Sequence, residues 1–272
     1  MSAHDLGSRA KKRLLSGLLA ALLAGVGSAP ALSAICDLHR FVEQCPTKDP
    51  AYASIRMDFT IRDNGKVVGS IPCQEPISQM DVNAYSHALT IVQDLRVIYY
   101  LSAKLPWTPG TLYAWLKAKV QGFNIMPTGN SYCCSAPFGD RRSYIFVHFN
   151  DADKDYHRKP KGLIQSIGLL MHERRHADGI LHVACCALGS NCDQRYDEAK
   201  LTPFGVQRWL DQRVVDGTVP TGYACAAPDK VEEFRKLLVQ SANGFKSRFC
   251  ENPPPDLPND YGLNAMQCSC PN

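Results

Sequence analysis

Apolar residues recur along the chain with two different periods, so the sequence predicts both strands and helices. Strands are expected over residues 57–61, 67–71 and 143–149, with Asn64-Gly65 forming a hairpin turn between the first two. Residues 125–142 are rich in Pro, Gly, Asn and Ser and predict a loop. Helices are expected over residues 82–104, from Thr108-Pro109 to Val120, from Leu163 to Gly179, around residues 204–210 and over residues 229–247. We therefore expect an α+β fold, in which helices back a small sheet that is mostly antiparallel or mixed.

The helix that ends near Gly179 has two chemically different faces. At about 100° per residue, its apolar side chains fall on an arc roughly 120° wide, and two histidines lie on the opposite side. The apolar arc consists of Leu163, Ile164, Ile167, Leu170 and Met171, whereas Gln165 and Gly168 share the histidine side. One face is therefore expected to pack on a core and the other to form a site. Arg174 falls within the apolar arc, and we expect it to extend to solvent at the end of the helix.

The histidine face carries the pattern H-E-x-x-H-x-x-G-x-x-H, which places candidate metal ligands at a suitable spacing. His172 and His176 lie one helical turn apart and can bind one Zn²⁺ together. Glu173 can act as general base on a metal-bound water. Gly179 can end the helix in a left-handed conformation, so that the chain turns back and His182 supplies the third ligand. Three protein ligands leave one position for water, which is the pattern of catalytic rather than structural zinc.

This stretch resembles the zinc-binding consensus of the metzincin metallopeptidases, with matches at the three histidines, Glu173 and Gly179. The resemblance implies a zincin-like active-site helix, bound Zn²⁺ and hydrolysis of peptide bonds. It also implies a strand just upstream of the helix that lies along the cleft and pairs with extended substrate, for which residues 143–149 are the candidate. An ordinary interior strand is the alternative for that segment. The methionine turn of the family would have to involve Met266, because the sequence has no other Met after His182.

A downstream acidic segment offers an alternative source of ligands for the same site. Some enzymes with an H-E-x-x-H motif take a glutamate as third ligand, and Glu198 lies at a suitable separation. Asp193 and Asp197 are expected either to cap a helix or to accept the free N–H of a ligand histidine. Tyr196 is a candidate hydrogen-bond donor to an oxyanion. His148 matches no ligand spacing and is expected to pack within its strand.

Residues 1–34 have the features of a secretory signal peptide. Four basic residues precede an uncharged apolar run over residues 14–26, and Ala31 and Ala34 are candidate cleavage sites. An uncleaved membrane anchor is the alternative, but the run is shorter than the roughly 20 residues of a membrane span. We expect a secreted or periplasmic protein in which residues 35–272 form a single domain, with membrane contact only if the signal segment is retained.

All twelve cysteines follow the signal segment, and their even number predicts up to six disulfides in an oxidising compartment. The domain is therefore expected to be disulfide-rich, with a cystine-rich C-terminal part. Cys185, Cys186 and Cys192 closely follow His182, so disulfides are expected to hold the segment that supplies the third ligand. A cysteine zinc site is the alternative, although the chain has no C-x-x-C pair.

The charge balance gives no electrostatic argument for nucleic acid as a partner. The whole chain has 30 basic and 26 acidic residues, and removal of the first 31 residues leaves 26 and 25, a net charge of about +1. Peptide or protein substrates are the expected partners, and we expect a monomer.

These features together predict a zinc-dependent metallopeptidase that acts outside the cytoplasm, with Glu173 as the catalytic base. Its expected Zn²⁺ ligands are His172, His176 and His182. An alternative from another class is a secreted, disulfide-stabilised binding protein with a structural or degenerate zinc site. A zinc hydrolase acting on another amide or on an ester is a third. An open coordination position distinguishes the enzymes from the binding protein.

Overall fold

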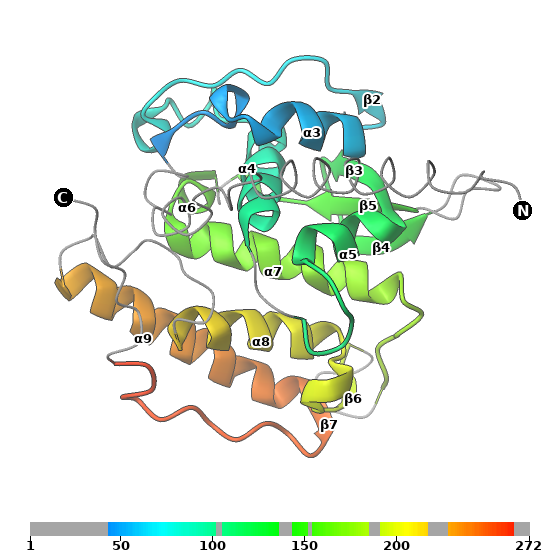
Figure 1. The fold of residues 1–272 in the computed structure, drawn as a ribbon, viewed down its shortest axis with the longest axis vertical. Helices are drawn as coiled ribbons and strands as arrows, with labels where there is room; N and C mark the ends of the chain where they lie inside the picture. The colour runs from blue at the N-terminus through cyan, green and yellow to red at the C-terminus, as the bar shows by residue number, and fades with distance from the viewer. Residues whose placement is uncertain are drawn as a thin grey trace, which may run out of the picture. The chain divides into compact units, whose positions relative to one another are not determined.

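A computed structural model describes residues 43–101, 105–135, 143–151, 154–184, 191–216 and 228–263 (Figure 1). Within these residues it contains seven α-helices, a five-stranded mixed sheet and a two-stranded sheet, so the fold is α+β as expected. The proposed signal segment and Met266 lie outside the described residues. In the part of the chain that is described, no helix is long and apolar enough to cross a lipid bilayer.

Five strands form the larger sheet in the order β2-β1-β3-β5-β4. They are β1 (Thr60–Asp63), β2 (Lys66–Val67), β3 (Val120–Met126), β4 (Tyr132–Ser135) and β5 (Ser143–His148). The pairs β1–β3 and β3–β5 are parallel, whereas the outer pairs β1–β2 and β4–β5 are antiparallel. The sheet is thus mixed, with parallel pairs at its centre. Strand β5 has a neighbour on each side, while β4 forms an edge.

The first hairpin forms where the sequence predicts it, with a shift in its first strand. Asn64 and Gly65 both have positive φ, 46° and 79°, as a two-residue turn with two left-handed positions requires. The strand expected from Met57 begins only at Thr60, because Met57 and Asp58 belong to the helix α3 (Ala51–Asp58).

Strands β3 and β4 lie where the sequence predicts a helix end and a loop. Val120 directly follows a helix, and its N–H still bonds to the carbonyl of Leu116, but the chain then extends between β1 and β5. Strand β4 is short and pairs only with β5. Both strands are stabilised by partners that are distant in sequence, which a local pattern does not reveal.

The remaining described helices are α4 (His87–Tyr100), α5 (Leu112–Lys119), α6 (Lys154–His157), α7 (Pro160–His176), α8 (Pro203–Val215) and α9 (Pro228–Gly244). The helix expected over residues 82–104 begins late because Ser86 caps it, accepting a hydrogen bond from the Leu89 N–H at 3.2 Å. The prediction that Thr108 caps the next helix is wrong. Thr111, one turn later, accepts from the Ala114 N–H at 3.2 Å and caps α5.

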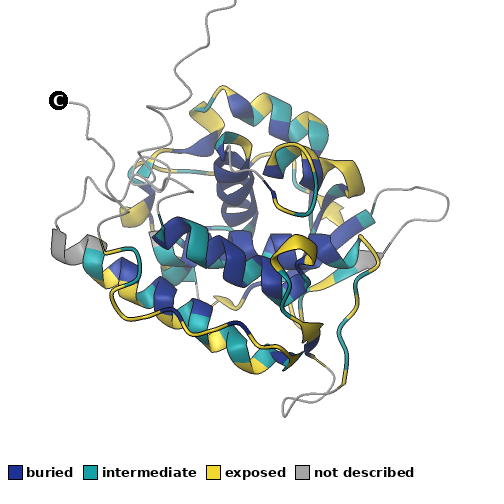
Figure 2. Ribbon diagram, turned by 60° about the horizontal axis from the view of Figure 1, so that its bottom comes forward, coloured by how far each residue is buried: buried dark blue, intermediate teal, exposed yellow. Residues whose placement is uncertain are grey.

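Helices α4 and α7 pack against one another and against the larger sheet, and α8 packs on α7 from the other side (Figure 1). Figure 2 shows that α4 is buried almost all round. Its Asp94 carboxyl group accepts a hydrogen bond from Ser166 Oγ of α7 at 2.6 Å. Burial raises the pKa of Asp94 well above its ordinary range, so the carboxyl group stays neutral, the form that a core tolerates. This bond ties the helix that carries two histidines to the most buried helix of the fold.

The two-faced character of α7 is confirmed, because every residue of the predicted apolar arc is buried and two histidines line a cavity. The expectation that Arg174 extends to solvent is wrong, since this residue is only 2% exposed. Its guanidinium lies 4.4 Å from the centre of the Trp115 ring. It donates to the Trp115 carbonyl at 2.9 Å and to Asp178 at 2.7 Å. An aromatic face, a carbonyl and a carboxylate together compensate the buried charge.

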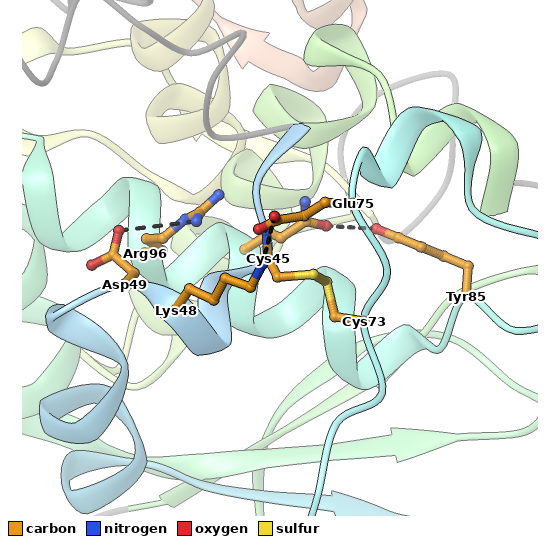
Figure 3. The surroundings of a disulfide bond; sticks show 8 residues. Cys45, Lys48, Asp49, Cys73, Glu75, Tyr85 and Arg96 are labelled. Atoms are coloured by element: carbon orange, nitrogen blue, oxygen red, sulfur yellow. Dashed lines mark hydrogen bonds and ion pairs between the residues drawn. A yellow bond between two sulfur atoms is a disulfide. The ribbon is translucent and has the colours of Figure 1, made fainter.

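A disulfide between Cys45 and Cys73 ties the segment before α3 to the chain after β2 (Figure 3). Beside it, Glu75 accepts hydrogen bonds from the Cys45 N–H at 2.8 Å and from Lys48 at 2.7 Å. Three further cysteines are disulfide-bonded, namely Cys133, Cys192 and Cys250. The described residues contain no free cysteine. The larger number of disulfides expected for the whole chain involves cysteines outside the described residues and stays a prediction.

Asp211 of α8 predicts a pH dependence of stability. Its side chain is buried, its Oδ2 atom has no hydrogen-bond partner, and burial raises its pKa from an ordinary 3.8 to about 7. Between these two pH values the folded protein binds more protons at Asp211 than the unfolded chain does. The free energy of unfolding therefore falls as the pH rises through this window, and the penalty is fully present above it.

We expect Asp211→Asn to remove this pH-dependent loss of stability. Relative to the wild type, the variant should gain roughly 2–3 kcal/mol in free energy of unfolding between pH 5 and pH 8, as measured by urea denaturation. Asp260→Asn, at an exposed position, is the control and should leave the pH profile unchanged. Parallel pH profiles for the wild type and Asp211→Asn would contradict the prediction.

Candidate metal centre

Three histidines meet near the C-terminal end of α7. His172 and His176 project from successive turns of the helix, and His182 reaches them from the segment that follows. The ring centres of each pair lie 4.6 to 5.0 Å apart, and one potential ligand atom of each residue lies within 4.8 Å of the others. The Nε2 atoms of His172 and His182 are 3.1 Å apart. This is close to the roughly 3.3 Å between two nitrogens that bind one tetrahedral Zn²⁺ at about 2.05 Å.

Local contacts build the turn that brings the third histidine back. Helix α7 ends at His176, and Gly179 has a φ of 85°, a left-handed conformation that glycine adopts at little cost. Within the turn, Asp178 accepts hydrogen bonds from two arginines of α7, Arg174 at 2.7 Å and Arg175 at 2.8 Å. The predicted left-handed conformation of Gly179 is therefore confirmed, although the helix itself ends three residues earlier, and the two arginines hold the reversal in place.

The segment after the turn is fixed by a bridge and a disulfide. Val183 and Cys192 form an isolated antiparallel bridge, in which the Val183 N–H donates to the Cys192 carbonyl at 2.7 Å. Cys192 is itself disulfide-bonded, which supports the expectation that cystines hold this segment. Cys185 and Cys186 lie outside the described residues.

Each imidazole is oriented by an oxygen atom that accepts a hydrogen bond from its Nδ1 atom. The acceptors are Gln207 Oε1 for His172, the Ile180 carbonyl for His176 and Asp193 Oδ1 for His182, at 2.8, 2.7 and 3.0 Å. Because these oxygens do not donate, each Nδ1 carries the proton and each Nε2 presents a lone pair. Lone pairs that face one another at this distance repel unless a cation lies between them. The donor set therefore fits a divalent metal ion.

The surroundings favour the neutral form of the histidines. Burial, together with the neighbouring rings of His176 and His182, lowers the pKa of His172 to about 3. Burial also lowers the pKa of His176. Neutral imidazole is the form that binds metal, so protons do not compete for these two side chains at neutral pH.

Glu173 lines the same cavity as the histidines, although it is only 4% exposed. The backbone N–H of Cys133 in β4 donates to its carboxylate, while its Oε2 atom is buried without a partner among the described residues. Burial raises the pKa of Glu173 to about 7. The carboxylate is therefore held by one backbone donor, and its Oε2 atom keeps an unused capacity to accept a hydrogen bond.

The cavity has a volume of about 570 Å³ and is lined by several parts of the fold. Helix α7 contributes its histidine face, the segment after it contributes His182, and β4 contributes Tyr132 and Cys133. Helix α8 contributes Phe204 and Gln207, and the 3₁₀-helix η6 (Phe245–Arg248) closes the remaining side. This volume is large enough for several residues of a peptide.

The structure decides two roles that the sequence left open for the acidic segment, a third ligand and an oxyanion donor. Glu198 does not join the histidine cluster. It lies instead 3.9 Å from Arg213 and accepts a hydrogen bond from the Tyr196 hydroxyl at 3.4 Å. Tyr196 is therefore not placed as an oxyanion donor, since it is not among the described residues that line the cavity. Asp193 has both predicted roles, because Oδ1 accepts from His182 while Oδ2 accepts from the Phe204 N–H at 2.7 Å.

The resemblance assigns the strand over residues 143–149 to the cleft, and this assignment is wrong. Strand β5 lies between β3 and β4, so neither of its edges is available to a substrate. The shorter strand β4 forms the edge of the sheet, and residues 130–133 line the cavity. His148, at the end of β5, is not part of the histidine cluster and contacts the Met126 carbonyl through Nδ1 at 3.2 Å.

Two groups of the site had no signal in the sequence. Gln207 holds His172 across 35 residues, and a glutamine in an amphipathic helix is usually a solvated side chain. The Cys133 N–H is a backbone group, and only the docking of β4 against α7 brings it to Glu173.

Comparisons with protein families, with curated proteins and with solved structures found no match to this chain.

The oxygen atoms that accept hydrogen bonds from the histidine Nδ1 atoms generate a prediction about metal affinity. Asp193→Asn should weaken Zn²⁺ binding roughly 10- to 100-fold, because an amide oxygen is a weaker acceptor for the His182 Nδ1–H than a carboxylate. Competition with a chelator of known affinity measures the change. Asp197→Asn is the matched control, since Asp197 bonds to the Ala199 N–H at 2.9 Å and contacts no histidine of the cluster. Equal affinities for the Asp193 and Asp197 variants would contradict the assignment.

Proposed function

We propose that the protein is a zinc-dependent metallopeptidase, as the likeness of its motif to the metzincin consensus implies. One observation carries the proposal: three Nε2 lone pairs converge in a cavity that also holds a buried carboxylate with an unpartnered oxygen. Zn²⁺ is the favoured ion, because three neutral imidazoles are its usual catalytic ligand set. In the described part of the chain no fourth His, Cys, Asp or Glu joins the cluster, which favours an open coordination position.

Zn²⁺ in such a site polarises a scissile carbonyl and lowers the pKa of a water molecule. Glu173 would accept the proton of the attacking water on the oxygen that lacks a partner, and then pass it to the leaving amine. Its raised pKa of about 7 suits both transfers near neutral pH. The Cys133 N–H would keep the carboxylate oriented while the proton moves.

An extended peptide would lie along β4. Among the described strands none pairs with the outer edge of β4, and residues 130–133 line the cavity beside the histidines. A peptide that added to this edge as a further strand would gain main-chain hydrogen bonds and pass over the metal ligands. Tyr132 is partly exposed there and stacks on Phe146 of β5, with ring centres 4.6 Å apart, so it offers an apolar surface to the substrate.

A binding protein with a structural or degenerate zinc site is the alternative from another class. A structural site is normally closed by four protein ligands, whereas this cluster has three and opens into a cavity. A buried glutamate with one unpartnered oxygen is costly in a binding protein and useful in a hydrolase. A hydrolase of another amide or of an ester would use the same groups, and the extended edge of β4 favours a peptide.

We further propose that the protein acts in a secreted or periplasmic compartment. Two features support this: the signal-like composition of residues 1–34, and the disulfide-bonded state of each cysteine whose pairing is described. A disulfide-rich domain without nucleic-acid partners, active as a monomer, is the simplest form consistent with the proposal.

The role of Glu173 can be separated from metal binding. Glu173→Gln should retain one Zn²⁺ per chain but lose at least about 100-fold in hydrolysis of a denatured protein, because the amide does not accept a proton. His182→Ala should lose both zinc and activity. Metal content is measured by elemental analysis, and cleavage is followed with and without a chelator. Wild-type rates in the Glu173→Gln variant would remove Glu173 from its role, and chelator-resistant cleavage would remove the metal.

A further inference from the structure

The cavity of the metal centre contains one arginine whose role the proposed chemistry does not explain. Among the described residues that line it, Arg248 and Glu173 are the only side chains with a formal charge, apart from the histidines. Arg248 ends η6, directly before the strand β7 (Phe249–Glu251). It therefore belongs to the side of the cavity built by η6.

A ring between Arg248 and the histidines positions the guanidinium. Arg248 lies 4.8 Å from the centre of the Phe204 ring. Phe204 also contacts two histidines of the cluster: it stacks on His182 at 4.8 Å and meets His172 edge-on at 4.7 Å. The guanidinium is thus no more than about 9.6 Å from the His182 ring centre. At roughly 3.4 Å per residue, this upper limit corresponds to at most about three residues of an extended peptide.

Several N–H groups of Arg248 are available to a ligand. Within the described residues, its hydrogen bond runs from one terminal nitrogen to the Asn191 carbonyl at 3.3 Å, and no carboxylate of these residues forms an ion pair with it. Seven other described arginines do pair with an Asp or Glu, namely Arg96, Arg158, Arg174, Arg175, Arg195, Arg213 and Arg235. A planar guanidinium held against a ring, with free donors and no counter-ion, is suited to bidentate binding of a carboxylate.

A second cavity next to the metal cavity also contains a cation. It has a volume of about 520 Å³, shares Leu169 with the metal cavity, and contains Lys161. None of the described residues that line it is an Asp or a Glu. A peptide long enough to occupy both cavities would meet a cation in each and only one carboxylate, that of Glu173. Such a lining favours anionic over cationic substrates.

We propose that Arg248 binds a carboxylate of the substrate, so that the enzyme selects peptides with an acidic group within about three residues of the scissile bond. This inference rests on the proposed peptidase function. The carboxylate belongs either to an Asp or Glu side chain or to the C-terminus of the peptide, and both present the same two oxygens to the guanidinium. The Phe204 ring limits the motion of the arginine and so reduces the entropy lost when the carboxylate binds.

Peptide pairs that differ only in charge test the proposal. One series replaces Glu by Gln at each position within three residues of the cleaved bond, and a second compares a free with an amidated C-terminus. The zinc-loaded wild type should cleave the acidic member of one series faster. Arg248→Gln should lose roughly 10- to 100-fold in kcat/KM on that member, mainly through KM, and less than about threefold on the neutral one. The series that responds identifies the source of the carboxylate.

Two further variants serve as controls. Arg248→Lys should show an intermediate loss, because lysine keeps the charge without the planar fork. Arg195→Gln removes the same charge from an arginine that pairs with Asp197 at 3.9 Å and does not line the cavity, and it should match the wild type. Equal losses of Arg248→Gln on acidic and neutral peptides, or a wild type without charge preference, would overturn the proposal.

A binding measurement separates this inference from the proposed function. If the wild type cleaves no peptide, the peptidase assignment fails, and the same peptide pairs are then titrated into the zinc-loaded protein by fluorescence anisotropy. Tighter binding of the acidic member that is lost in Arg248→Gln would still support a carboxylate site. Equal binding of both members would overturn it.

Discussion

The candidate site depends on the orientation of three imidazole rings, and that orientation depends on three hydrogen bonds from Nδ1 to oxygen. The acceptors come from an amide on α8, a carbonyl in the turn after α7 and the carboxylate of Asp193. If any of these bonds were absent, the ring could rotate and its Nε2 lone pair would no longer point at the others. Asp193 connects two requirements, because its second oxygen bonds to the Phe204 N–H near the start of α8. The same carboxylate thus orients a ligand and anchors the helix that orients another.

Two buried arginines of α7 stabilise the turn that follows this helix. Arg174 and Arg175 occupy positions that a simple amphipathic helix would fill with apolar residues, and both donate to Asp178 in the turn. Desolvating two guanidinium groups costs free energy that a single carboxylate offsets only in part. The contacts of Arg174 with Trp115 and of Arg175 with the Leu201 carbonyl supply the remainder. What this arrangement contributes is a fixed geometry for the turn, and the position of His182 follows from it.

The charges around the cavity are distributed unevenly, although the chain outside the signal-like segment is close to neutral. Most arginines near the site are consumed in ion pairs or in hydrogen bonds to carbonyls. Arg248 is retained against an aromatic ring, and Glu173 is retained in a buried position. A cavity with a cation at one wall and a carboxylate beside the metal ligands can distinguish the two ends or the side chains of a peptide. Net charge alone would not have indicated this, because the difference lies in which charges lack partners.

The local part of the site could be predicted from the order of residues alone. The spacing of His172 and His176, the apolar arc behind them and the left-handed Gly179 all follow from helix geometry and glycine stereochemistry, which act within one or two turns. The Asn64-Gly65 hairpin turn is predictable for the same reason. Tertiary structure decided which strand borders the cavity, where Gln207 bonds and how Arg174 is buried. These outcomes depend on contacts between residues 35 or more positions apart, for which the local pattern contains no signal. Packing selects among several arrangements that the local chain would accept equally well, and in the one observed each of the three histidine Nδ1 atoms has its oxygen partner.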